Sequence, residues 1–141
     1  MDVALVELVW ERAAHCCEYC LMPQELDDLP FEMDHIIAIK HGGLTVANNL
    51  ALSCFRDNSH KGSNVGGLDR KTRKFTPLFH PRRHAWHRHF RWKGAQLLGR
   101  TAIGRVTIAV LNINDPLRVE RRQYLIDEGL FPPLLTPPSG D

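Results

Sequence analysis

FEMDHIIAIKHGGLTVANNLALSCFRDNSHKGSN, residues 31–64, is the stretch that decides the fold and the chemistry expected of this chain. It places an Asp-His pair, Asp34 and His35, ahead of a Gly-Gly turn and of the group Asn58-Ser59-His60-Lys61. A histidine titrates near neutrality and can take a proton from water, while carboxylate and amide oxygens suit Mg²⁺ or Mn²⁺. The spacing therefore predicts one metal-assisted site that cleaves phosphodiester bonds.

Each residue of this site has an expected role. His35 would activate water as a general base, and Asp34 and Asn58 would hold the metal. On a regular strand Asp34 would face away from His35, unless the strand bends or ends there. The plain alternative for His35 is a buried histidine at a strand end. The joint spacing of the Gly-Gly, Asn-Leu and Asn-x-x-Lys segments favours the catalytic interpretation.

The chain has 141 residues, of which 43% are hydrophobic, and this suits one compact domain. We expect a single domain over 1–141, with a core at about 16–66, a basic hairpin and helical extension at about 67–129, and a proline-rich tail at 130–141. The first residues carry acids and an arginine instead of a basic region followed by an apolar run. We therefore expect no signal peptide, no membrane association and a cytoplasmic location.

Positive charge gathers in the middle of the chain, although the net charge is only +2. From Arg70 to Asn114 there are eleven Lys/Arg and no acid, whereas residues 1–69 hold eleven acids and four Lys/Arg. Clustered cations neutralise phosphates, so this region is expected to bind nucleic acid. The expected contacts are Lys61, His60, Arg70, Lys71, Arg73, Lys74, Arg82 and Arg83.

Apolar periodicity and turn signals predict short elements. In the first half these are a helix from Val3 to about His15, strands at Phe31–Ile37 and Leu50–Leu52, and a short helix from about Arg56 to Asn64. Beyond it we expect a polar turn over 69–76, a hairpin over 90–99 turning at Lys93-Gly94, two helices capped by Thr101 and Asp115 that end near Ile113 and Glu128, and an extended end from Phe131. The aromatic residues of the basic region are expected to pack in the core instead of stacking on bases. They are Trp86, Phe90 and Trp92.

These motifs resemble the HNH endonucleases, and the similarity covers Cys17 to about Asn64. The wider layout, including Gly66-Gly67-Leu68-Asp69, 77–83 and 89–92, resembles small bacterial HNH proteins. The resemblance implies an α+β fold: a ββα-metal core with an N-terminal helix, a following β-hairpin and C-terminal helices. It also implies that the substrate is DNA, hydrolysed by a single-metal mechanism with Mg²⁺ or Mn²⁺.

The resemblance gives the Asp-His pair the same roles as above and adds two further residues. Asn49, with Asn48 as the alternative, would brace the loop through backbone hydrogen bonds. Asn58 matches the third residue of the motif, and Lys61, three residues later, would be a phosphate or a structural contact.

The cysteines suggest a second metal. Cys17-x-x-Cys20 has metal-ligand spacing, and in a reducing compartment cysteines serve as ligands or buried thiols more often than as disulfides. The resemblance implies a structural zinc held by two Cys-x-x-Cys pairs, but here Cys54 is followed by Asp57 where the family usually has cysteine. Aspartate can ligate zinc, so these four residues form a possible site that binds more weakly than four thiolates. Cys16 is expected to be a packed thiol.

Two other functions remain open from the sequence. In the first, the core is a zinc-knuckle scaffold that binds nucleic acid without cleaving it, and the departure at Asp57 favours this. In the second, the chain is a toxin-like or mobile-element nuclease that needs a partner for targeting, because no separate specificity domain is recognisable.

Overall fold

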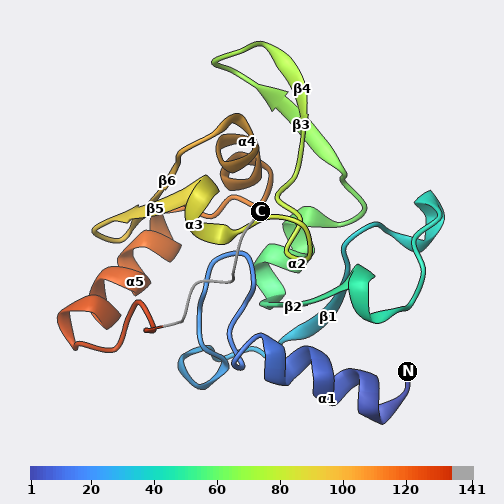
Figure 1. Cartoon of the computed structure of the whole chain (residues 1–141). Coiled ribbons are helices and arrows are strands. Elements are labelled where there is room, and N and C mark those ends of the chain that lie inside the picture. Colours follow the sequence, from blue (N-terminus) through green and yellow to red (C-terminus); the bar gives the residue numbers. More distant parts are fainter. Residues whose placement is uncertain (135–141) are drawn as a thin grey trace.

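In the computed structural model, residues 1–134 are described, and 135–141 lie outside the described part. The elements are short and mixed in type (Figure 1), and none of the described helices is long and apolar enough to cross a membrane. They are α1 (Val3–Arg12), β1 (Glu32–His35), β2 (Leu50–Ser53), α2 (Phe55–Lys61), β3 (Gly66–Asp69), β4 (Lys74–Pro77), α3 (Trp86–His89), β5 (Phe90–Lys93), β6 (Gln96–Gly99), α4 (Ala102–Val110) and α5 (Pro116–Asp127). Single-turn 3-10 helices lie at Gln24–Leu26, Ile39–His41 and Ala47–Asn49.

β1, β2 and α2 form the centre of the fold. β1 and β2 pair antiparallel, with Asp34 opposite Ala51 and His35 opposite Leu50. All four residues of β2 are buried, and α2 follows at once with Cys54 as its N-cap. This is the ββα core that the resemblance implied, so the predicted α+β class is confirmed.

α1 closes one side of this core. Asp2 caps the helix by accepting a hydrogen bond from the backbone N–H of Ala4. At the other end, the Arg12 guanidinium donates to the backbone oxygens of Ala47 and Leu50, both at 2.6 Å. The predicted N-terminal helix is confirmed, and its last residue holds the loop that leads into β2.

The hairpin of β3 and β4 corrects one prediction. The sequence predicts only a polar turn over 69–76, but the segment is part of a two-stranded hairpin in which Leu68 lies opposite Phe75. These two side chains are 64% and 69% exposed. Glycines at the start of β3 and exposed apolar residues within the hairpin remove the usual alternation of apolar-in and polar-out, so the strands leave no clear pattern.

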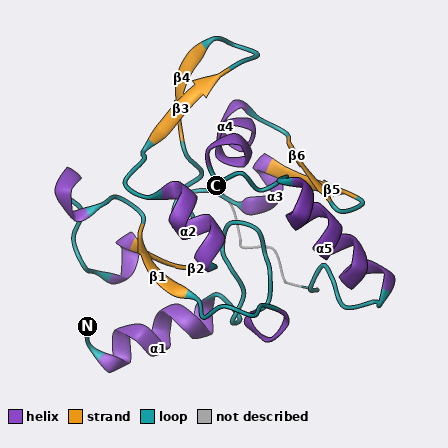
Figure 2. Cartoon of the chain, turned by 180° about the vertical axis from the view of Figure 1, so that it is seen from behind, coloured by secondary structure: helices purple, strands orange, loops and turns teal. Residues whose placement is uncertain are grey.

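The other face of this hairpin rests on α4. A Cβ atom at Gly67 would meet the side chains of Val106 and Val110 at 3.3 and 3.1 Å, so the glycine allows close packing. Nearer the turn, the buried Asp69 pairs with Arg105 of α4 through two N–O contacts of 3.0 Å. Figures 1 and 2 show the hairpin extending beyond the rest of the molecule above α4.

The C-terminal half largely follows the predictions. β5 and β6 form the predicted hairpin around Gly94, whose φ of 59° explains the glycine. Thr101 and Asp115 cap α4 and α5 as expected, although α4 ends at Val110, three residues before the predicted end. The single-turn helix α3 is not predicted. Of the expected extended end, 131–134 are described and the rest lies outside the described residues.

The aromatic residues of the basic region pack in the core, as predicted. Trp86 and Phe90 are 5% and 0% exposed, and the indole Nε1 of Trp86 donates to the backbone oxygen of Tyr19 at 2.8 Å. Trp92 is half-buried, with the guanidinium of Arg122 lying 5.3 Å from its ring centre. One continuous group of buried side chains joins α1 to these rings and to α5.

Candidate functional site

Asp34 and His35 end β1 and have different surroundings. Asp34 is 4% exposed, whereas His35 is half-buried. Nε2 of His35 lies 2.8 Å from Oγ1 of Thr45, in the connection between β1 and β2. β1 ends at His35, and the charge of His35 is among the influences that lower the pKa of Asp34. The two side chains thus differ in exposure but lie close enough to interact.

Both carboxylate oxygens of Asp34 have hydrogen-bond donors. The Tyr19 hydroxyl donates to Oδ2 at 2.6 Å, and Nζ of Lys61 donates to Oδ1 at 3.0 Å. The side chains of Asp34 and Lys61 are 3% and 2% exposed, so the ion pair is buried. Burial raises the pKa of Asp34, and the Lys61 ammonium partly opposes this. A metal ion can reach Asp34 only through the remaining lone pairs, or by displacing Lys61.

Lys61 also ties α2 to β1. Its ammonium donates to the backbone oxygen of His35 at 3.1 Å, in addition to Asp34. Of the two roles expected for Lys61, a phosphate contact or a structural contact, this geometry corresponds to the structural one. The prediction that Lys61 contacts nucleic acid is therefore corrected, because the ammonium group of Lys61 is enclosed by the protein.

Asn49 braces the loop after β1. Its Oδ1 accepts from the backbone N–H of Ile37 at 2.9 Å, and its Nδ2 donates to the backbone oxygens of Ile37 and Leu44 at 3.0 and 2.9 Å. Gly43 fits beneath this brace, because a Cβ atom there would lie 1.7 Å from the Ile37 oxygen. These are the backbone hydrogen bonds that the resemblance implied for Asn49. The alternative residue, Asn48, is exposed.

Asn58 and His60 lie on different faces of α2. Asn58 precedes Lys61 by three residues, and this spacing puts both on the face toward β1. Its side chain forms no hydrogen bond with another residue of the described range 1–134. His60 instead lines a cavity of about 470 Å³ with Arg118 and Arg121 of α5. Helical spacing thus places Asn58, but not His60, on the face of α2 that carries Lys61.

The four predicted zinc ligands meet in one buried cluster. The ligand atoms of Cys17, Cys20, Cys54 and Asp57 all lie within 4.8 Å of one another. The sulfurs of Cys20 and Cys54 are 3.8 Å apart, and tetrahedral zinc with Zn–S bonds of about 2.3 Å requires a separation of about 3.8 Å. All four cysteines are free thiols, and Cys16 lies outside the cluster as expected. The donor set therefore fits zinc.

Asp57 occupies the fourth corner of this cluster through one of its two oxygens. Oδ2 lies 3.2 Å from the sulfur of Cys17, while Oδ1 accepts from the guanidinium of Arg118 at 2.7 Å. Without a metal, burial and the neighbouring Cys20 raise the pKa of Asp57 to about 7, although Arg118 opposes the shift. A metal-free cluster therefore holds a carboxyl group that titrates near neutrality.

The predicted phosphate contacts separate into groups. Four of them lie at the end of the β3–β4 hairpin and are exposed: Arg70, Lys71, Arg73 and Lys74. The acid beside them, Asp69, is neutralised by Arg105. This end of the hairpin, which we call the basic tip, therefore presents four uncompensated positive charges on the element that extends furthest in Figure 1.

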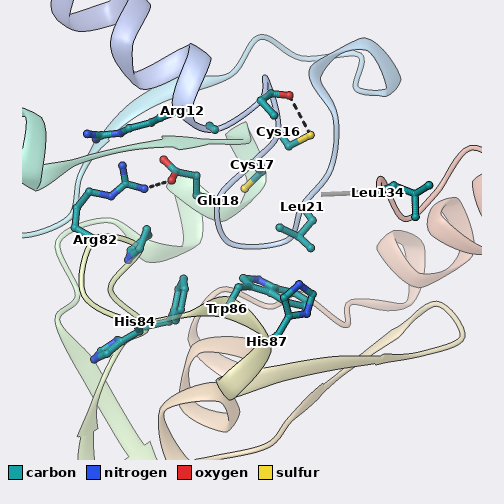
Figure 3. Close-up of a pocket in the computed structure, with 14 residues that line it drawn as sticks. Arg12, Cys16, Cys17, Glu18, Leu21, Arg82, His84, Trp86, His87 and Leu134 are labelled. Carbon is teal, nitrogen blue, oxygen red and sulfur yellow. Dashed lines mark hydrogen bonds and ion pairs between the residues drawn. The ribbon is translucent and has the colours of Figure 1, made fainter. Parts of the chain in front are cut away.

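Arg82 does not belong to an open phosphate surface, and this prediction is corrected. Its side chain is 16% exposed and its guanidinium pairs with Glu18 (Figure 3). Arg83 is exposed and lines a cavity of about 220 Å³ together with Lys61 and His80. Burial and the charge of Arg83 lower the pKa of His80 to about 4, so His80 is neutral near pH 7.

A cavity of about 690 Å³ lies between the end of α1 and the segment before α3 (Figure 3). Glu18 stands in its wall, but its carboxylate already accepts from the backbone N–H of Leu52 at 2.8 Å and pairs with Arg82. Neither Asp34 nor His35 lines this cavity. It is therefore separate from the predicted catalytic residues.

Three residues with clear roles around the sites escaped sequence reasoning: Glu18, Tyr19 and Arg118. Tyr19 lies between Cys17 and Cys20 but contacts Asp34, and Arg118 is 61 positions away from its partner Asp57. Contacts of this range leave no local pattern. The only signal is that a buried acid needs a donor or a cation, and one sequence does not say which residue supplies it.

A model of the HNH endonuclease family matches residues 17–64. No curated protein and no solved structure gives a significant match to the chain. The matched residues contain all four members of the cluster of three cysteines and Asp57. They also contain both strands of the central hairpin, β1 and β2, and the helix α2. Residues 17–64, which form the ββα core, are therefore an HNH endonuclease domain within this chain.

Proposed function

We propose that this protein is a metal-dependent endonuclease that hydrolyses phosphodiester bonds in DNA by an HNH single-metal mechanism. The observation that carries the proposal is the position of His35 within the family's core: its imidazole is half-buried at the end of β1, outside the enclosed side where Asp34 lies. The HNH domain at residues 17–64 supports a nuclease. The choice of DNA rests on the resemblance to small bacterial HNH proteins.

His35 is proposed as the general base. A phosphodiester is a poor electrophile, so the attacking water must lose its proton as it attacks. Nε2 of His35 contacts the Thr45 hydroxyl, which fixes the ring orientation, so Nδ1 is the atom that would accept this proton. Asn49 contributes by bracing the loop that carries Thr45.

The proposed catalytic metal is Mg²⁺ or Mn²⁺, held by Asp34 and Asn58. A divalent ion would neutralise charge on the phosphate and help the departing oxygen. The amide oxygen of Asn58 has no competing partner among residues 1–134, which supports its part. Asp34 offers only the lone pairs that Tyr19 and Lys61 leave, so its contribution depends on these two donors.

The cluster of three cysteines and Asp57 is proposed to hold a structural zinc. Its support is the buried tetrahedral donor set described above. The thiols must stay reduced to serve as ligands, which agrees with the cytoplasmic location expected from the sequence. The continuous group of buried side chains from α1 to α5 supports a single domain over the described residues.

DNA is proposed to contact the exposed cations, above all the basic tip. Four positive charges on a protruding two-stranded ribbon can follow a phosphate backbone, and the exposed Leu68 and Phe75 beside them can contact a groove. This proposed DNA-binding surface does not include Lys61 and Arg82, because their charges are paired with Asp34 and Glu18 inside the protein.

One observation favours the alternative of a nucleic-acid-binding module without cleavage. Both carboxylate oxygens of Asp34 accept hydrogen bonds, from Tyr19 and from Lys61. If these bonds keep a metal ion from Asp34, the protein has no catalytic metal centre. In this case the basic tip and the cysteine cluster would be the functional parts.

An assay of supercoiled plasmid with Mg²⁺, Mn²⁺, Zn²⁺ or EDTA separates the two functions. The nuclease predicts nicked or linear products with Mg²⁺ or Mn²⁺ and none with EDTA. Salt-sensitive DNA binding with no cleavage under any metal would establish the alternative and reject the nuclease.

A further inference from the structure

Asp57 stands where a family zinc ligand is usually cysteine, and it has one more ligand atom than a thiolate. We propose that Arg118 is the positioning residue for this carboxylate, and that metal binding at the cluster holds α5 against the HNH core. This inference rests on the proposed structural zinc and goes beyond it, because it assigns a role to the C-terminal helix outside the matched residues 17–64.

The geometry gives the two oxygens of Asp57 different partners. Oδ2 points to the sulfur of Cys17 inside the cluster, and Oδ1 accepts from Arg118 at 2.7 Å. The Asp57 side chain is fully buried and that of Arg118 is 10% exposed, so water does not take the place of either partner. With Oδ1 held in this way, only Oδ2 remains to ligate an ion, as a tetrahedral site requires.

Arg118 is itself held in place. Its other terminal nitrogen donates to the backbone oxygens of Leu111 and Asn112, at 3.1 and 3.2 Å, where α4 ends. Asp115 caps α5 just before it and fixes the start of the helix. A rigid donor that joins α4, α5 and α2 can therefore transmit the orientation of α5 to Asp57.

The charges around the cluster agree with this role. Three thiolates and one carboxylate around a divalent ion leave two negative charges in the interior. Arg118 and Arg122 of α5 line the same 470 Å³ cavity as Cys20 and Cys54. Arg122 is 2% exposed, and its hydrogen-bond partners are uncharged oxygens: Ala95 O, Ile113 O and Asn114 Oδ1. A metal-loaded cluster supplies the negative charge that these two buried cations need.

Cysteine at position 57 could not make this connection. A single sulfur that ligates zinc offers only a weak acceptor to a guanidinium, so Arg118 would lose its charged partner. The aspartate and the arginine thus act as a pair, with a carboxylate that links the metal to a helix from another part of the chain. Outer partners of metal ligands typically change metal affinity by about 10- to 100-fold.

The test measures zinc affinity by competition with a chromophoric chelator, and amide hydrogen exchange of α5 with and without zinc. The proteins are wild type, Arg118→Met, Arg118→Lys, Asp57→Cys and a control, Arg100→Met, which removes an exposed arginine that does not line this cavity. We expect about 10- to 100-fold weaker zinc binding in Arg118→Met, with less loss in Arg118→Lys, and no change in the control.

Zinc-dependent hydrogen exchange in α5 distinguishes the proposed role of Arg118 from that of a structural ion pair alone, which would not make the exchange depend on zinc. In wild type, zinc should slow exchange in α5, and in Asp57→Cys zinc should still bind but no longer slow it. Wild-type zinc affinity in Arg118→Met, or α5 exchange that is independent of zinc in wild type, would overturn the inference while leaving the zinc site intact. A wild-type protein that binds no zinc would overturn the inference and the zinc proposal together.

Discussion

At the residue scale, Lys61 and Asp34 decide how the core can work. The HNH pattern places a lysine three residues after Asn58, and the structure turns it inward to a carboxylate that is also bonded to Tyr19. Two predicted arrangements are present: Asn49 makes the expected brace, and the three cysteines meet Asp57. It does not predict the orientation of Lys61, because either direction fits its place on a short helix.

Replacing Lys61 with methionine is expected to destabilise the fold by about 3–5 kcal/mol, because it leaves the buried Asp34 carboxylate without its cation. Urea unfolding measures the change. Lys40→Met is the matched control, since Lys40 is exposed and its loss should change the unfolding free energy by less than about 0.5 kcal/mol. Equal stability of the two variants would contradict the buried ion pair.

At the element scale, the predictions succeed where local signals set the structure. The caps Thr101 and Asp115 and the turn at Gly94 each have a local physical cause, and each lies where it was predicted. The β3–β4 hairpin was missed because its strands are stabilised by α4, through Gly67 and the Asp69–Arg105 pair, and not by their own alternation. Such support comes from residues about 40 positions away in sequence, so local patterns do not contain it.

The basic tip is expected to contribute a large part of the salt dependence of DNA binding. Arg70→Gln, Lys71→Gln and Lys74→Gln together should lower the slope of log K against log [salt] by about 3, at roughly one unit for each phosphate contact. Fluorescence anisotropy with a labelled duplex at several salt concentrations measures this slope.

The matched control is a triple variant in the other hairpin, at Arg91, Lys93 and Arg100, all of which are exposed. It removes the same charge from β5 and from the residue that follows β6. If both triple variants lower the slope equally, the effect is one of net charge, and the basic tip is not the DNA contact.

At the scale of the whole molecule, two buried polar centres join elements that are far apart in the sequence. The first is the Asp34–Lys61 pair, and the second is the cysteine cluster with Asp57 and Arg118. The sequence could predict the ββα core because its motif is local. How α5 docks could not be predicted, since it depends on an ion pair between residues 57 and 118.

Removing the proposed zinc should therefore destabilise the whole fold and not only the cysteine cluster. At zinc concentrations about 1,000-fold above the dissociation constant, binding adds about 4 kcal/mol of stability. For a chain of this size, a strong chelator should lower Tm by about 10 °C. Differential scanning calorimetry before and after chelation, with zinc added back, measures the shift. An unchanged Tm would contradict a structural metal.

The central claim, that His35 is the general base of a nuclease, is tested most directly by the rate of plasmid nicking in His35→Ala. We predict a rate about 10²- to 10⁴-fold below wild type at saturating Mg²⁺ or Mn²⁺, with DNA affinity preserved. His41→Ala, which removes an exposed histidine from the same connection, should cleave at the wild-type rate. Cleavage at the wild-type rate by purified His35→Ala would show that His35 is not the general base.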